Sequence, residues 1–317
     1  MAPDESGSLD APMRLRFVSS AAGAAAVAAA ATLLASVDPR PGLKVVATIF
    51  PLGEFAREVG GDRTETEILV PPGADIHSWQ PRLGDIKTLA GERGLFLYLG
   101  SGLDPWAEDL FRNAAGPGWK RLEASRGLRL IQETDHEEGE GHATDPHVWL
   151  DFDQDRAIVD RVAAALAELS PSEAPIFEAN ARAYKARLED LDRRYAEALR
   201  SCRGRRLVVG GHAAFAYLAR RYGLVQTAVM GPTPEASPAP RDIVRIIALA
   251  KSENIAAVFH EPGSGDRLAR TIAREIGAEV LLLHPGHNLT EARGGRTTFI
   301  DLMERNLENL RHGLGCR

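Results

Sequence analysis

The chain has 317 residues, which is enough for one large domain or two medium ones. Hydrophobic residues make up 44% and charged residues 26%, an ordinary balance for a globular protein. The formal net charge is −6 and no basic stripe is present, so the composition argues against a nucleic-acid partner, whose phosphates need clustered lysine and arginine.

The first residues have the pattern of a targeting segment. Arg14 and Arg16 form a short basic region, and the uncharged, mostly apolar run 17–34 follows them. This order is typical of an export signal, so we expect residues 1–42 to be a leader and export signal and the protein to act in the periplasm. The run is marginally long enough to cross a bilayer, so an uncleaved anchor is the alternative.

Beyond the leader, short apolar runs alternate with helical stretches. This alternation predicts an α/β fold in which mostly parallel sheets are covered by helices. The strands are expected at Leu43–Phe50, Thr66–Val70, Leu95–Leu99, Arg206–Gly210, Ile255–Phe259 and Glu279–Leu283.

One long helix is predicted in the middle of the chain, over residues 172–201. The segment Ser170–Glu173 has the pattern of a capping box with proline at the first helical position. Apolar residues then recur at helical spacing from Phe177 to Leu199, and no glycine or proline interrupts them. The prediction is therefore an N-terminal α/β lobe (43–169), a linking helix (170–203) and a C-terminal α/β lobe (204–317).

The chain has two cysteines, Cys202 and Cys316. An exported protein with an even cysteine count can form a disulfide. This one would close a loop of about 110 residues and would stabilise the fold by roughly 4–5 kcal/mol in the chain-entropy model. Two free buried thiols are the alternative.

Several histidines follow expected strands or lie in stiff loops. Open α/β sheets bind ligands at the carboxyl ends of their strands, and zinc is usually held by four ligands, often neutral imidazoles. Two candidates fall in each lobe, which predicts a zinc site between the lobes. Because only neutral imidazole binds metal, we expect the affinity to fall as the pH drops from about 7 to 5. The candidates are His77, His147, His212, and either His284 or His287.

The fourth ligand is the open choice. His284 directly follows an expected strand, and Pro285 restrains the peptide after it, so we predict His284 as the fourth ligand. His287 is the alternative, and water or a carboxylate is a further one. A four-nitrogen site suits Zn²⁺ better than Mn²⁺, which prefers oxygen. The segment 135–142 holds two histidines among four acids, so it is either a disordered acidic loop or a weak auxiliary metal site.

Three motifs together resemble a known family. Pro72–Pro81, Asp145–Asp151 and Gly211–Phe215 are similar, in the same order, to the ligand loops of the periplasmic metal-binding proteins of zinc and manganese ABC importers, the cluster A-I solute-binding proteins. The zinc-uptake members are the most similar, and the resemblance runs from about Leu43 to the end of the chain. One departure is His284-Pro285, where the family usually has an acid before the proline.

The resemblance implies a monomeric, non-enzymatic protein that binds zinc through His77, His147 and His212. It also implies delivery of the metal to an ABC transporter permease in the cytoplasmic membrane. Two other classes are weighed against this one. A zinc-dependent hydrolase would use three histidines and an open position, but the chain has no His-Glu-x-x-His motif. A metal-dependent adhesin of the cell surface would use the same residues.

Overall fold

Eight strands form two parallel sheets, one in each half of the part of the chain that the structure describes. The computed structural model describes residues 42–91, 93–132, 144–232, 238–263, 266–287, 289 and 297–317. The sheet orders are β2-β1-β3-β4 and β6-β5-β7-β8, so the spatial order of the four strands is the same in both halves. The strands are β1 Leu43–Ala47, β2 Thr64–Ile68, β3 Arg93–Tyr98, β4 Gly118–Glu123, β5 Arg206–Val209, β6 Val225–Ala228, β7 Ala257–His260 and β8 Glu279–Leu282.

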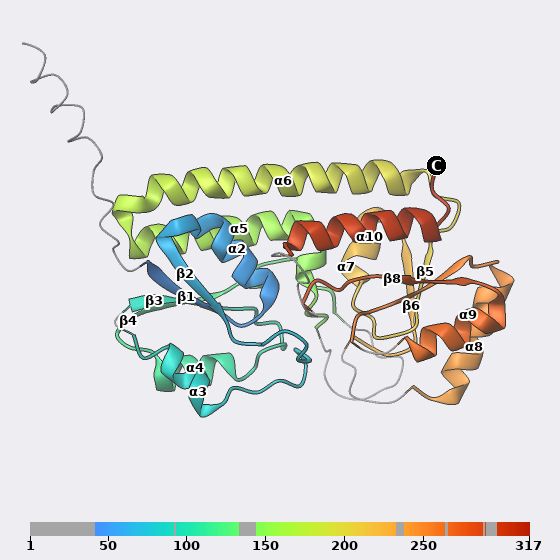
Figure 1. Ribbon diagram of the computed structural model, residues 1–317, viewed down its shortest axis with the longest axis horizontal. Helices are drawn as coiled ribbons and strands as arrows, with labels where there is room; N and C mark the ends of the chain where they lie inside the picture. Colours follow the sequence, from blue (N-terminus) through green and yellow to red (C-terminus); the bar gives the residue numbers. More distant parts are fainter. Residues whose placement is uncertain are drawn as a thin grey trace, which may run out of the picture. The chain divides into compact units, whose positions relative to one another are not determined.

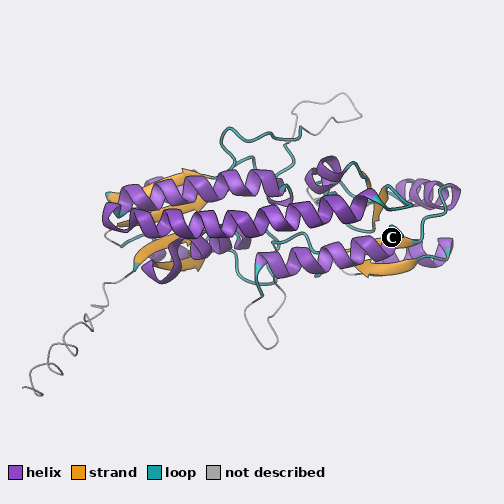
Figure 2. Ribbon diagram, turned by 90° about the horizontal axis from the view of Figure 1, so that it is seen from above, coloured by secondary structure: helices purple, strands orange, loops and turns teal. Residues whose placement is uncertain are grey.

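Helices cover both sheets, and the longest of them runs over the two together. Figure 1 shows α6 extending above both sheets, with α5 beneath its first half and α10 beneath its second half. Seen from above, α5, α6 and α10 lie side by side (Figure 2). The helices are α2 Phe50–Gly60, α3 Leu83–Thr88, α4 Ala107–Ala114, α5 Phe152–Leu169, α6 Ala174–Arg200, α7 Ala216–Tyr222, α8 Pro240–Ser252, α9 Arg267–Ile276 and α10 Phe299–Gly313.

The strand side chains alternate between two packed layers, as a sheet buried on both faces requires. In β1, Val45 and Ala47 join the large core that includes α2, α5 and α6, whereas Val46 faces the smaller core that includes α4. In β5, Val209 belongs to the same large core, and Val208 packs with α8 and α9. One continuous apolar layer therefore runs beneath α6 through both halves of the chain.

The predicted fold class is confirmed, including the parallel sheets and the long helix. The start of that helix differs from the prediction. Pro171–Glu173 forms a separate 3₁₀ turn, the Ser170 hydroxyl donates to Glu173, and the α-helix begins at Ala174. Among the described α-helices and strands, six were not predicted, namely α3, α4, α5, α8, β4 and β6. Among the described helices, none is both long and apolar enough to cross a membrane.

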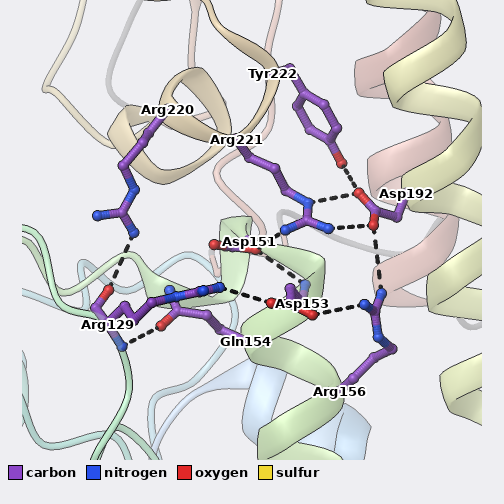
Figure 3. A network of polar contacts seen from close by, with 9 residues as sticks. All are labelled: Arg129, Asp151, Asp153, Gln154, Arg156, Asp192, Arg220, Arg221 and Tyr222. Carbon is purple, nitrogen blue, oxygen red and sulfur yellow. Dashed lines mark hydrogen bonds and ion pairs between the residues drawn. The ribbon is translucent and has the colours of Figure 1, made fainter.

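A polar network ties α7, in the second half of the chain, to α5 and α6 (Figure 3). Arg221 on α7 donates to Asp151 at 2.8 Å, at the start of α5, and to Asp192 on α6 at 2.7 Å. Tyr222 also donates to Asp192, at 2.8 Å, and Arg156 on α5 lies 3.6 Å from the same carboxylate. A partly buried fork of this kind fixes orientation as well as adding energy, so the network restrains α7 relative to the two helices.

The two cysteines form a disulfide. Cys202 follows α6 and Cys316 follows α10, so the bond joins the end of the long helix to the end of the chain across 114 residues of sequence. The main chain adds a hydrogen bond of 3.0 Å from the Gly204 N–H to the Leu314 carbonyl. The disulfide that the sequence left open is therefore present.

Removing this disulfide is expected to lower the free energy of unfolding by roughly 4–5 kcal/mol, because the unfolded chain regains the entropy of a long closed loop. Urea unfolding of a Cys202→Ser/Cys316→Ser variant measures the loss, and a reductant should change the wild type but not this variant. A loss of less than about 1 kcal/mol would contradict the loop-closure argument.

Candidate metal centre

Four histidines converge between the carboxyl ends of the two sheets. One ring nitrogen from each lies within 4.8 Å of the others. His77 comes from the loop after β2, and His147 immediately precedes the 3₁₀ helix Val148–Leu150. His212 follows β5 and His287 follows β8. Each half of the chain thus contributes two imidazoles.

Two of the imidazoles already have the separation that a metal would require. The Nε2 atoms of His147 and His212 lie 3.2 Å apart. Tetrahedral zinc with Zn–N bonds of 2.0–2.1 Å would place its nitrogen ligands about 3.3–3.4 Å apart. The Nδ1 of His147 contacts Asp145 at 2.9 Å, and the Nδ1 of His212 contacts Glu261 at 2.8 Å. Carboxylates only accept hydrogen bonds, so each Nδ1 carries the proton and each Nε2 presents a lone pair.

Sheet topology explains how Glu261 reaches His212. β5 and β7 are neighbours in the second sheet, with Val209 opposite Phe259. His212 lies shortly after Val209, and Glu261 follows shortly after Phe259, so both side chains emerge at the same sheet edge. This is where the chain order of a doubly wound sheet reverses and where ligands bind.

The other two imidazoles have buried nitrogen atoms without a hydrogen-bond partner among the described residues. These atoms are Nε2 of His77 and both ring nitrogens of His287. Buried polar atoms are nearly always satisfied, and leaving one unsatisfied costs about 1–3 kcal/mol. A cation at the centre of the four rings would satisfy Nε2 of His77 and one ring nitrogen of His287. The His77 loop is held from within, because the Asp75 carboxylate accepts the His77 N–H at 3.0 Å.

The structure brings His287 rather than His284 into the group. Gly286 has φ +83°, and a Cβ there would lie 3.3 Å from the Trp149 indole nitrogen, so the turn needs glycine. Trp149 donates to the Pro285 carbonyl at 2.7 Å, which fixes this turn against the His147 segment.

His284 is used inside the turn instead. Its Nδ1 accepts the Gly286 N–H at 2.9 Å, and Asn306 bonds its main-chain N–H and C=O, both at 2.7 Å. The geometry therefore favours the predicted alternative, His287, over His284 as the fourth ligand. Two histidines outside the group have local partners: His260 lies 3.2 Å from the Glu261 carbonyl and His312 lies 2.7 Å from Glu279.

Burial lowers the pKa of three of the imidazoles, those of His77, His147 and His287, and so favours the neutral form that binds metal. Desolvation, with contributions from His147 and His212, lowers the pKa of His77 to about 2. Desolvation lowers the pKa of His147, and it lowers that of His287 well below the usual value. Protons compete with a metal for ordinary histidines between pH 7 and 5. For these three histidines, the lowered pKa values move this competition to more acidic pH.

The predicted auxiliary loop, 135–142 with His136 and His142, lies outside the described residues. Its two ends are closed by contacts that do not involve it. Gln132 and Thr144 form an antiparallel bridge, and the Asp145 N–H donates to the Ile131 carbonyl at 3.0 Å. The Tyr217 hydroxyl donates to the Asp145 carbonyl and accepts the Ile131 N–H, both at 2.9 Å.

Deletion of residues 135–142 should therefore leave tight zinc binding within about threefold of the wild-type value, because Tyr217 and the bridge still hold Asp145 and His147. Weaker additional metal binding, if the loop provides it, should disappear. Calorimetric titration of both proteins with zinc counts the two kinds of site. Loss of the tight site would show that the loop supplies a ligand.

The chain matches the sequence profile of the family described as zinc-uptake complex component A, periplasmic, over residues 45–313. It belongs to this family. The zinc-binding lipoprotein AdcA of Streptococcus pneumoniae is 32% identical over 279 residues, which cover 85% of this chain and 55% of AdcA. The high-affinity zinc uptake system protein ZnuA of Bacillus subtilis is 30% identical, covering 86% of this chain and 88% of that protein. This chain thus spans about half the length of the AdcA relatives.

Solved structures of family members share the fold. A crystal structure of ZnuA has a TM-score of 0.75 at 27% identity and covers 86% of this chain and 99% of that one. The Zn(II)-bound ZnuA-like domain of Streptococcus pneumoniae AdcA has a TM-score of 0.73 at 30% identity and covers the same shares of the two chains.

Two supporting residues of the site, Asp145 and Tyr217, were not predicted from the sequence. The spacing Asp145-Pro-His147 is a signal for Asp145, since an aspartate commonly accepts the main-chain N–H two residues on. The Pro285-Gly286 pair signals the turn that redirects His287. For Tyr217, which acts across the two halves of the chain, no local pattern gives a signal.

Proposed function

We propose that this protein captures one zinc ion with His77, His147, His212 and His287 and delivers it to an ABC transporter permease in the cytoplasmic membrane. The observation that supports this most directly is the convergence of four ring nitrogens within 4.8 Å. The family match and the zinc-binding relatives AdcA and ZnuA support the choice of cargo and of transport.

The donor set favours zinc over manganese. Four neutral imidazole nitrogens in a compact group suit tetrahedral Zn²⁺, whereas Mn²⁺ prefers oxygen ligands and higher coordination. The pair of Nε2 atoms 3.2 Å apart has the spacing of two tetrahedral ligands. Cu²⁺ prefers a square-planar set, so a tetrahedral arrangement of the four nitrogens would favour Zn²⁺ over Cu²⁺.

The fourth histidine also argues against a hydrolase. A catalytic zinc site keeps one position open for water, while a closed four-ligand site does not. As the proposed fourth ligand, His287 would take the position that water needs, so the protein is proposed to bind and release metal without catalysis. All four ligands come from one chain, which is why we propose that a monomer is sufficient.

The arrangement of the halves supports a rigid carrier. We propose that 43–169 and 204–317 act as two metal-holding lobes and that 170–203 connects them. The shared apolar layer beneath α6 and the Arg221 network both restrain opening of the lobes. Metal release is then proposed to involve loop motion rather than a wide hinge. Export by residues 1–42, with or without cleavage, is proposed to place the carrier in the periplasm.

Zinc titration of the purified protein tests this function. We expect one tightly bound zinc per chain, displaced poorly by a large excess of manganese, and restored zinc-limited growth when the gene is expressed in a bacterium lacking its own zinc carrier. Binding of manganese in preference to zinc, or hydrolysis of ester or phosphate substrates, would contradict the proposal.

Adhesion is a second candidate. The laminin-binding protein Lmb of Streptococcus agalactiae, described as having adhesin and metal-transporting activity, has a TM-score of 0.75 and 31% identity to this chain. Measuring binding to immobilised laminin, with and without zinc, distinguishes a dual role from transport alone.

A further inference from the structure

The two halves of the chain hold one histidine each in the same way. In the first half, Oδ1 of Asp145 accepts both the main-chain N–H and the ring Nδ1–H of His147, each at 2.9 Å. In the second half, Oε1 of Glu261 accepts the main-chain N–H of His212 at 3.2 Å and its ring Nδ1–H at 2.8 Å. In each half, a single carboxylate oxygen thus contacts both the ring and the main-chain N–H of the same histidine.

The sequence origins of the two contacts are unrelated. Asp145 is two residues before His147. Glu261 is 49 residues after His212 and directly follows β7, the strand next to β5. The same contact is therefore built once by a local turn and once by sheet topology. Both carboxylates are buried, with 3% of each residue exposed.

The contact has two consequences for the metal. It fixes the tautomer and the direction of each ring, so that the Nε2 lone pairs of His147 and His212 face each other 3.2 Å apart. It also places two negative charges immediately behind four neutral ligands. A divalent cation would make the buried site neutral, whereas a monovalent cation would leave an uncompensated negative charge in a low-dielectric region.

We propose that Asp145 and Glu261 are paired positioning residues that set both the geometry and the charge selectivity of the site for a divalent metal. This inference rests on the proposed function, since it concerns the same four-histidine centre. It differs from a purely structural role in one respect: removal of a carboxylate charge should weaken Zn²⁺ binding more than Ag⁺ binding.

The test compares Asp145→Asn, Glu261→Gln and Glu261→Asp with the wild type. The amides keep an oxygen acceptor but lose the charge, and the shorter Glu261→Asp keeps the charge but loses reach. Each amide variant is expected to weaken Zn²⁺ binding about 10- to 100-fold and to weaken Ag⁺ binding less. The visible spectrum of Co²⁺ bound to these variants should remain that of a tetrahedral site, while in Glu261→Asp it should change.

Asp104→Asn is the matched control. Asp104 is a buried carboxylate that accepts the Thr48 hydroxyl and two main-chain N–H groups and contacts no histidine in these bonds. The Asp104→Asn variant should bind Zn²⁺ within about twofold of the wild-type affinity. Thermal unfolding without metal reports any general loss of stability in every variant.

Wild-type Zn²⁺ affinity in both amide variants, or equal losses for Zn²⁺ and Ag⁺, would overturn the inference while leaving the carrier function intact. Failure of the wild type to bind zinc would overturn the function itself.

Discussion

His287→Asn is expected to weaken zinc binding by about 100-fold or more, whereas His284→Asn should leave the affinity within about threefold. Structural zinc sites with four ligands have binding free energies of roughly 10–16 kcal/mol, so one ligand accounts on average for about 2.5–4 kcal/mol. His287 offers one of its buried ring nitrogens to the group of four, while His284 accepts the Gly286 N–H. Asparagine at 284 keeps an acceptor close to the position of Nδ1.

The two variants carry the same substitution three residues apart, so they control for each other. Competition with a chromophoric zinc chelator measures both affinities, and thermal unfolding of the metal-free proteins shows whether either variant is misfolded. Loss of binding in His284→Asn together with retention in His287→Asn would reverse the assignment and restore the preference derived from the sequence.

The two histidines show where sequence reasoning about this site ends. Three ligands, His77, His147 and His212, could be proposed from the sequence because each lies in a motif that resembles a ligand loop of the family. The choice between His284 and His287 depends instead on the backbone at Gly286, which turns the chain at φ +83°, and on the Trp149 indole from the other half of the chain. The turn at Gly286 is local and has a signal in the Pro285-Gly286 pair, but the Trp149 contact that holds it is not local, so periodicity and spacing could not decide between the two histidines.

The fold shows the same division. Strands with strongly apolar runs, such as β1 and β7, were predictable, because a strand buried on both faces reads as a continuous apolar segment. The edge strands β4 and β6 were not predicted, because polar residues interrupt their apolar runs, namely Lys120, Arg121 and Gln226. Helix α5 was predictable in retrospect, since Asp151 caps it and its apolar residues keep helical spacing. The shared strand order of the two halves has no counterpart in sequence repeats.

The metal-free protein should lose stability as the pH falls below about 6.5, the pKa of an unperturbed histidine. Burial holds the folded-state pKa of His77 at about 2 and lowers those of His147 and His287. The unfolded chain therefore binds more protons than the folded chain below pH 6.5, and the free energy of unfolding decreases as protons are added. Each such histidine contributes a slope of up to about 1.4 kcal/mol per pH unit, and three together up to about 4 kcal/mol per pH unit.

Asp155 acts in the opposite direction and has to be separated from this effect. Desolvation raises the pKa of its fully buried carboxyl group well above the usual value, so its contribution to stability is lost as the pH rises through the folded-state pKa. Urea unfolding between pH 7.5 and 5, in an Asp155→Asn background and with zinc removed by a chelator, isolates the histidines and stays above the range in which ordinary carboxylates titrate. The His77→Asn variant should bind up to one proton fewer on unfolding, so the slope of the free energy of unfolding should fall by up to about 1.4 kcal/mol per pH unit. A free energy of unfolding that does not change over this range would mean that the imidazoles are protonated in the folded metal-free protein and that the site is not held ready for a cation.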